Sequence, residues 1–109
     1  MRSAILVYDI NGNFLRKEDD RDLSEAIANN IFLLREECTK VLNRSGMDQS
    51  TQQNAALGIY SPDRCDAIKS YISSCRNEYL RCKALILSAQ TNDEADAVQF
   101  VAPQVPENL

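Results

Sequence analysis

The sequence predicts an α+β protein that is predominantly helical, with an N-terminal β-hairpin followed by two long helices packed as an antiparallel, coiled-coil-like hairpin. Two long segments carry apolar residues at alternating intervals of three and four, the period of helices that pack lengthwise. An Asn-Gly turn separates two short β-prone runs near the N-terminus. A chain of 109 residues has the length of one domain. The alternative is an all-α oligomeric bundle, because heptad patterns also permit self-pairing.

The β-hairpin is expected over residues 3–17. Residues 3–8 are β-prone, and residues 14–17 would form the returning strand. Between them, Asn11 and Gly12 readily supply the two positive φ angles of a tight turn. A lone hairpin is marginally stable in water, so we expect its apolar side to dock on another surface, of this chain or of a partner.

The first long helix is expected over residues 23–43. Asp22 and Glu25 have the spacing of a capping box, with Asp in place of the usual Ser or Thr. Gly46, just beyond, suits a helix C-terminus. Its apolar positions recur at intervals of four and three: Ile27, Ile31, Leu34, Cys38 and Val41.

The second long helix is expected over residues 62–90, where Ser61 supplies a capping hydroxyl and Pro62 suits the first helical position. Its apolar positions alternate at three and four without a break: Cys65, Ile68, Ile72, Cys75, Tyr79, Cys82, Ile86 and Ala89. This pattern predicts a long helix packed lengthwise on another helix. Cysteines at such positions are expected to be core residues, because a buried cysteine behaves as a small hydrophobe.

The connector over residues 46–60 is polar. It forms either a short helix, capped by Asp48 and ending at Gly58, or a mobile loop, and its glutamine content favours the loop. We expect residues 1–90 to form a single compact domain and residues 91–109 to form an acidic, proline-containing tail.

The composition argues against an enzyme. The chain has no histidine, so neither a Cys-His nor a Ser-His pair can form. Its four cysteines lack the close Cys-x2–4-Cys spacing of zinc sites, and its three glycines form no phosphate-binding loop. We therefore expect no catalytic residues, no cofactor and no metal.

The net charge of −4 discourages binding to nucleic acid and to anionic membranes. No apolar run approaches the roughly 20 residues of a membrane span. Too few apolar residues precede Asp9 for a signal peptide. We expect a cytoplasmic protein with no membrane partner.

Three basic residues, Lys69, Arg76 and Lys83, recur at intervals of seven beside the predicted apolar seam of the second helix. On a helix they form one basic stripe. The stripe is either a solvated flank or a surface that receives an acidic segment, from a partner or from the chain's own residues 93–96. Nucleic acid is an unlikely partner, because no stacking aromatic residues interleave with the stripe.

Further apolar residues lie outside both seams: Phe32 and Leu33 on the first helix, and Leu80, Leu85 and Leu87 on the second. Two facing helices cover one stripe each, so this surplus needs a third layer. The hairpin, the tail, a second copy or a foreign protein could supply it. Burying one such side chain is worth roughly 1.5–3 kcal/mol. We expect these five residues and the basic stripe to bind a protein partner or a second copy.

These patterns predict a non-enzymatic protein–protein interaction module, such as a small adaptor, a chaperone-like escort or a stoichiometric inhibitor. One alternative is a structural subunit of a larger assembly, whose hairpin or tail adds a strand to a neighbouring sheet. A less favoured alternative is a nucleic-acid-associated factor that uses the basic stripe.

Overall fold

The computed structural model describes residues 4–107, and the statements below concern those residues. It shows a mixed α/β protein, mostly helical, with two strands and four helices within that range. The molecule is elongated, with extents of 60 × 30 × 20 Å and a radius of gyration of 18.6 Å. A compact domain of this length would have a radius of gyration of about 13 Å. An elongated chain exposes more of its surface than a compact chain of the same length.

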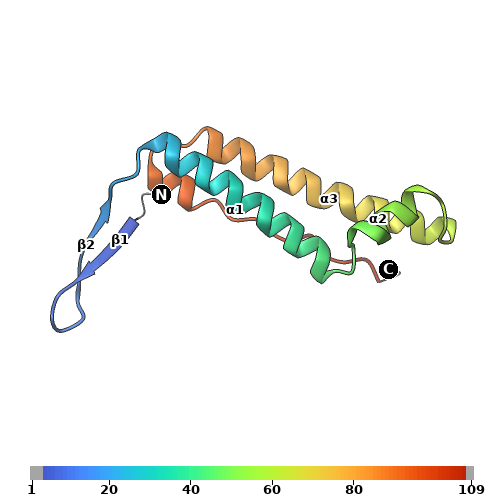
Figure 1. Cartoon of the computed structure of the whole chain (residues 1–109), viewed down its shortest axis with the longest axis horizontal. Coiled ribbons are helices and arrows are strands. Elements are labelled where there is room, and N and C mark those ends of the chain that lie inside the picture. Colours follow the sequence, from blue (N-terminus) through green and yellow to red (C-terminus); the bar gives the residue numbers. More distant parts are fainter. Residues whose placement is uncertain (1–3, 108–109) are drawn as a thin grey trace.

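The two strands form an antiparallel hairpin at one end of the molecule (Figure 1). Strand β1 spans Ala4–Tyr8 and strand β2 spans Phe14–Asp19, two residues beyond the predicted end. The ring of Tyr8 meets the ring of Phe14 edge to face, with centroids 5.8 Å apart. This hairpin, residues 4–19, is called the arm below.

The predicted turn forms at residues 9–13, but the expected pair of positive φ angles is wrong. Of Asn11 and Gly12, only Gly12 has a positive φ, of 86°. The carboxylate of Asp9 accepts hydrogen bonds from the backbone N–H groups of Asn11 and Asn13, both at 2.9 Å. These bonds lower the pKa of Asp9, the bond from Asn13 contributing most. They hold a wider loop, in which Asn11 does not need the left-handed conformation.

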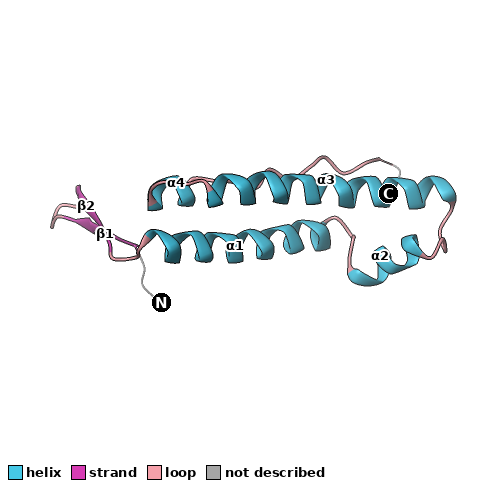
Figure 2. Ribbon diagram, turned by 90° about the horizontal axis from the view of Figure 1, so that it is seen from above, coloured by secondary structure: helices cyan, strands magenta, loops and turns pink. Residues whose placement is uncertain are grey.

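Two long helices lie side by side and run in opposite directions (Figures 1 and 2). Helix α1 spans Leu23–Arg44, and helix α3 spans Pro62–Leu87, three residues shorter than predicted. The Asp22 carboxylate caps α1 by accepting a hydrogen bond from the Glu25 N–H at 2.8 Å. Helix α3 ends early because the chain must turn back toward α1 before residue 92.

Two short helices complete the fold. Helix α2, Gln49–Ala56, occupies the connector, and the Asp48 side chain caps it by accepting from the Thr51 N–H. The helical alternative for this segment is therefore the one that forms. Helix α4, Asn92–Asp96, was not predicted; the Thr91 hydroxyl caps it. Within the described residues, no helix combines the length and apolarity that a membrane span requires.

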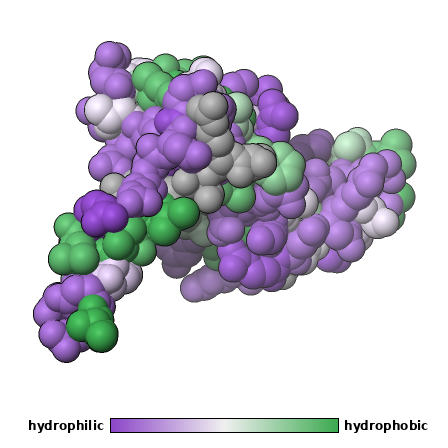
Figure 3. All heavy atoms as spheres, turned by 60° about the vertical axis from the view of Figure 1, so that its left-hand side comes forward, coloured by the Kyte–Doolittle hydropathy of each residue, from purple (hydrophilic) through white to green (hydrophobic). Residues whose placement is uncertain are grey.

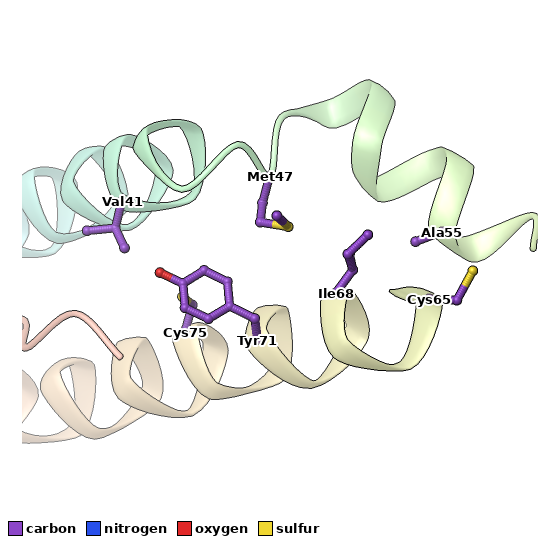
Figure 4. Packing of buried hydrophobic residues seen from close by; sticks show 7 residues of the cluster. All are labelled: Val41, Met47, Ala55, Cys65, Ile68, Tyr71 and Cys75. Atoms are coloured by element: carbon purple, nitrogen blue, oxygen red, sulfur yellow. The ribbon is translucent and has the colours of Figure 1, made fainter. Parts of the chain in front are cut away.

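The core consists of two clusters along the α1–α3 interface. The first lies where α2 folds over α3 (Figure 4), and its buried members are Val41, Met47, Ala55, Cys65, Ile68, Tyr71 and Cys75. The second contains Leu34, Cys82 and Ile86. Most of these positions belong to the predicted seams, because the 3–4 spacing keeps one side of each helix toward its partner.

Tyr71 is a core residue that the predicted seam omits. It is 2% exposed, whereas its seam neighbour Ile72 is only half-buried. The Tyr71 hydroxyl lies 2.8 Å from the Ser45 hydroxyl, which itself donates to the Val41 carbonyl. The tyrosine must therefore donate to Ser45, and this bond satisfies a buried polar group that the apolar pattern cannot anticipate.

The C-terminal segment runs back along the helix pair (Figures 1 and 2). Val98 and Phe100 pack on the second core cluster. The Glu78 carboxylate accepts a hydrogen bond from the Val101 N–H at 2.7 Å, and the Gln99 carbonyl accepts one from Arg81 at 3.3 Å. The tail thus supplies a third layer on one side of the two helices.

Of the possible third layers, the arm supplies none within the described residues, and its apolar side stays undocked there. Within residues 4–107, strands β1 and β2 pack on each other and on no helix. Only the base of the arm is fixed, where Asn92 and Arg21 donate hydrogen bonds to the Asp19 carboxylate. The arm projects because residues 20–22 lead straight from β2 into α1 and leave no length for a return.

Candidate protein-binding surface

The five apolar residues predicted to bind a partner are all exposed, with accessibilities between 46% and 58%. They are Phe32, Leu33, Leu80, Leu85 and Leu87. The tail and the arm therefore leave this surplus largely uncovered.

These residues do not form one continuous patch. Leu80 and Leu87, seven residues apart, share one side of α3, where Arg76 and Lys83 are their neighbours at intervals of three and four. Leu85 follows Glu78 by seven residues and so lies on the side along which the tail runs. The three predicted residues of α3 thus lie on two different sides of that helix, and Phe32 and Leu33 lie on α1.

Among the described residues, one groove between the long helices carries part of the tail and a second one does not. Leu33 and Leu34 line this tail-side groove together with Ile86, Val98 and Phe100. The second groove, called the open groove below, has a volume of about 430 Å³. Four residues of each helix line it: Arg35, Cys38, Thr39 and Leu42 of α1, and Ile72, Cys75, Arg76 and Tyr79 of α3. No residue of the tail is among them.

The open groove combines an apolar floor with two cations. Arg35 lies on its α1 side and Arg76 on its α3 side. The Arg35 Nε donates a hydrogen bond to the Tyr79 hydroxyl at 3.3 Å. Among residues 4–107, no carboxylate forms an ion pair with Arg35 or Arg76. Both guanidinium groups can therefore bind an anionic group without breaking an existing ion pair.

The basic stripe lies along this side of α3. Lys69 and Arg76 are exposed and Lys83 is half-buried, but only Arg76 lines the open groove. The carboxylate of Asp96, a candidate to bind the basic stripe, instead binds the side chains of Arg21 and Asn30, both at 2.8 Å. The sequence could not place Arg35 opposite Arg76, because that pairing depends on the register between two separate helices.

The arm is a second exposed apolar region, to which the sequence analysis gave a binding role only as a strand added to a neighbouring sheet. Its large exposed residues are Ile5, Leu6, Tyr8, Ile10, Phe14 and Leu15. In the space-filling view, hydrophobic residues cover much of the projecting arm (Figure 3).

Hydrogen bonds and burial explain the shifted pKa values of the ionisable groups near the grooves. Hydrogen bonds from Arg81 lower the pKa of Glu78 to about 2. Burial raises the pKa of Cys38, Cys75 and Cys82, so these thiols are poorer nucleophiles than an exposed cysteine. In the described part of the chain, no three His, Cys, Asp or Glu side chains gather as a metal site would require.

Comparisons with protein-family models, with curated proteins and with solved structures give no match to this chain.

Proposed function

We propose that this protein is a non-enzymatic protein–protein interaction module, such as a small adaptor, a chaperone-like escort or a stoichiometric inhibitor. The supporting observation is the number of large apolar side chains that remain exposed along the arm and the long helices. Burying each one would contribute roughly 1.5–3 kcal/mol. Extended apolar surfaces on a protein commonly mark interaction sites.

The thin shape explains this exposure. A bundle one helix pair thick can enclose only the facing sides of α1 and α3, and the tail covers one further side. We propose that the two helices keep the coiled-coil-like packing predicted by their heptad spacing, which would present a straight, rigid surface to a partner. The proposed setting is the cytoplasm, where a reducing environment suits four free cysteines.

Affinity capture with matched variants tests the proposal. The Leu80→Asp, Leu87→Asp double variant removes apolar surface from the outer side of α3. The control, Ser50→Asp with Gln53→Asp, adds the same charge at two exposed polar positions of α2, away from this side of α3. We expect the wild-type protein and the control to retain a stoichiometric partner from an extract of the source cells, and the leucine variant to lose it. Equal capture by all three proteins would contradict the proposal.

A second candidate function is a structural subunit of a larger assembly, favoured by the arm. Strand β1 contains no charged residue, whereas β2 carries Arg16, Lys17, Glu18 and Asp19. Charged side chains discourage edge pairing, so the free edge of β1 is the better site for an added strand. The isolated chain would then associate into large species that Ile5→Lys with Leu15→Lys disperses. A monodisperse wild-type monomer in light scattering would count against this candidate.

A further inference from the structure

We infer that the open groove between α1 and α3 binds an acidic amphipathic helix of a partner protein. This inference rests on the proposed interaction function and specifies the partner at one of its sites. Three considerations support it: the hydrogen-bonding groups of the groove, its charge, and the contact it would make with a second copy of itself.

The hydrogen-bonding groups favour a helix over an extended chain. In the tail-side groove, charged side chains pair two backbone groups of the extended tail: Glu78 accepts from the Val101 N–H, and Arg81 donates to the Gln99 carbonyl. The open groove is lined by no carboxylate. Its side-chain oxygens are the hydroxyls of Thr39 and Tyr79, and the latter already accepts from Arg35.

An extended segment in the open groove would therefore bury backbone N–H groups that lack acceptors, which is costly. A helix pairs its own backbone internally and needs only side-chain contacts. An incoming helix would complete a three-helix arrangement with α1 and α3, in the helix-in-groove mode of recognition.

The charge of the groove specifies the sequence character of that helix. Leu42, Ile72 and Tyr79 offer an apolar floor, which would receive an apolar stripe. Arg35 and Arg76 stand on opposite sides of the floor without carboxylate partners among the described residues. Acidic side chains on both flanks of the apolar stripe would meet them, and a guanidinium can bind a carboxylate through two parallel hydrogen bonds.

Symmetry argues against a second copy of this chain in the groove. A twofold contact sets the same patch against itself, so Arg35 and Arg76 of one copy would face the same two arginines of the other, with no carboxylate among the described lining residues to offset them. Like charges across an interface are repulsive. The chain's own acidic helix α4 is also engaged elsewhere, through Asp96 and Arg21.

The experiment uses the full chain and a synthetic probe. The probe is a fluorescent 21-residue peptide with Leu at heptad positions a and d and Glu at e and g; a second peptide carries Lys at e and g. Fluorescence anisotropy compares the wild-type protein with the Arg35→Glu, Arg76→Glu variant. The control variant, Arg16→Glu with Lys40→Glu, changes the net charge equally at positions outside the open groove. Circular dichroism verifies that both variants fold.

We expect the acidic peptide to bind the wild-type protein, and binding to weaken about tenfold or more in the Arg35→Glu, Arg76→Glu variant. The control variant should bind within about twofold of wild type, and the basic peptide at least about tenfold more weakly than the acidic one. The bound acidic peptide should also slow alkylation of Cys38, which lines the groove.

Three results would overturn the inference: no binding of the acidic peptide up to millimolar concentration, equal affinity for both peptides, or equal losses in both variants. A homodimer that the Arg35→Glu, Arg76→Glu variant converts to monomer would identify a second copy as the occupant instead. If capture of a partner fails only with Leu80→Asp and Leu87→Asp, the proposed function stands and the groove is not its site.

Discussion

The guanidinium of Arg21 lies 2.8 Å from the carboxylate of Asp96, so residues 75 positions apart are joined at one end of the molecule. Arg21 also binds the carboxylate of Asp19, the last residue of β2, at 2.7 Å. The side chain of Arg21 is only 6% exposed. This pairing raises the pKa of Arg21, and it holds the pKa of Asp19 well below its usual range. One side chain therefore connects the arm, the start of α1 and α4.

Replacing Arg21 with Met should release α4 and the base of the arm. Because charge-assisted hydrogen bonds are lost on both sides, amide hydrogen exchange within residues 92–96 should accelerate by about tenfold. The control is Arg16→Met, which removes an ion pair with Glu18 whose two side chains are more than half exposed. Unchanged exchange in the Arg21 variant would show that the bridge does not hold α4.

The core should tolerate substitution far less than the exposed surface. Ile68 is fully buried, so Ile68→Ala should lower the free energy of unfolding by about 2–5 kcal/mol. Leu57 is 76% exposed, so Leu57→Ala should change it by less than about 0.5 kcal/mol. Urea denaturation of both variants measures the difference. Similar losses would mean that the first core cluster is wrongly placed.

Acid should detach the tail through Glu78. Its pKa is about 2 in the folded protein against an ordinary value of 4.5, chiefly because Arg81 donates hydrogen bonds to it. A depressed pKa contributes stability above pH 4.5 that is lost as the pH falls toward 2. The contribution is about 1 kcal/mol, since the Arg81 side chain is half exposed and solvent screens the pair.

Urea denaturation of wild type and Glu78→Gln at several pH values measures this contribution. The stability difference between them should be present at pH 6 and should vanish near pH 2. The variant comparison is needed because Asp9 and Asp48 also have lowered pKa values and weaken the fold in acid. A difference independent of pH would exclude the ionised Glu78 as its source.

The cysteines should react in an order set by burial. Cys38 is half-buried beside the open groove, whereas Cys75 and Cys82 are fully buried. Burial also raises the pKa of all three thiols, which lowers their thiolate fractions. At pH 7.5 we expect iodoacetamide to label Cys38 first, and Cys75 and Cys82 about a hundredfold more slowly than in urea. Peptide mapping by mass spectrometry gives the order; rapid native labelling of Cys75 would contradict its core position.

Local sequence signals predicted most of the secondary structure. Asp22 and Ser61 act as helix caps in the structure, as their sequence context indicated. Helix α4 was not predicted, because five residues are too few to reveal a periodic spacing of apolar residues. The burial of Tyr71 was not predicted, because its hydroxyl needs the hydrogen bond to Ser45, which lies at the end of another helix.

The candidate site was predictable in composition but not in arrangement. Leu80 and Leu87 were expected to be surplus apolar residues, and they are exposed. Leu80 and Leu87 lie on one side of α3 and Leu85 lies on the side of the tail. This division could not be predicted, because it depends on where the tail lies. The position of Arg35 opposite Arg76 likewise requires the register of α1 against α3.

By itself, the sequence determined the two long helices, the β-hairpin and the lack of any histidine-dependent catalytic pair. These features depend on residue types and on spacings of a few residues, which act locally. Only the tertiary structure decided which surfaces are covered: the tail fills one groove of the helix pair, the other stays open, and the arm projects. Coverage depends on contacts between residues far apart in the chain, such as Glu78 with Val101 and Arg21 with Asp96.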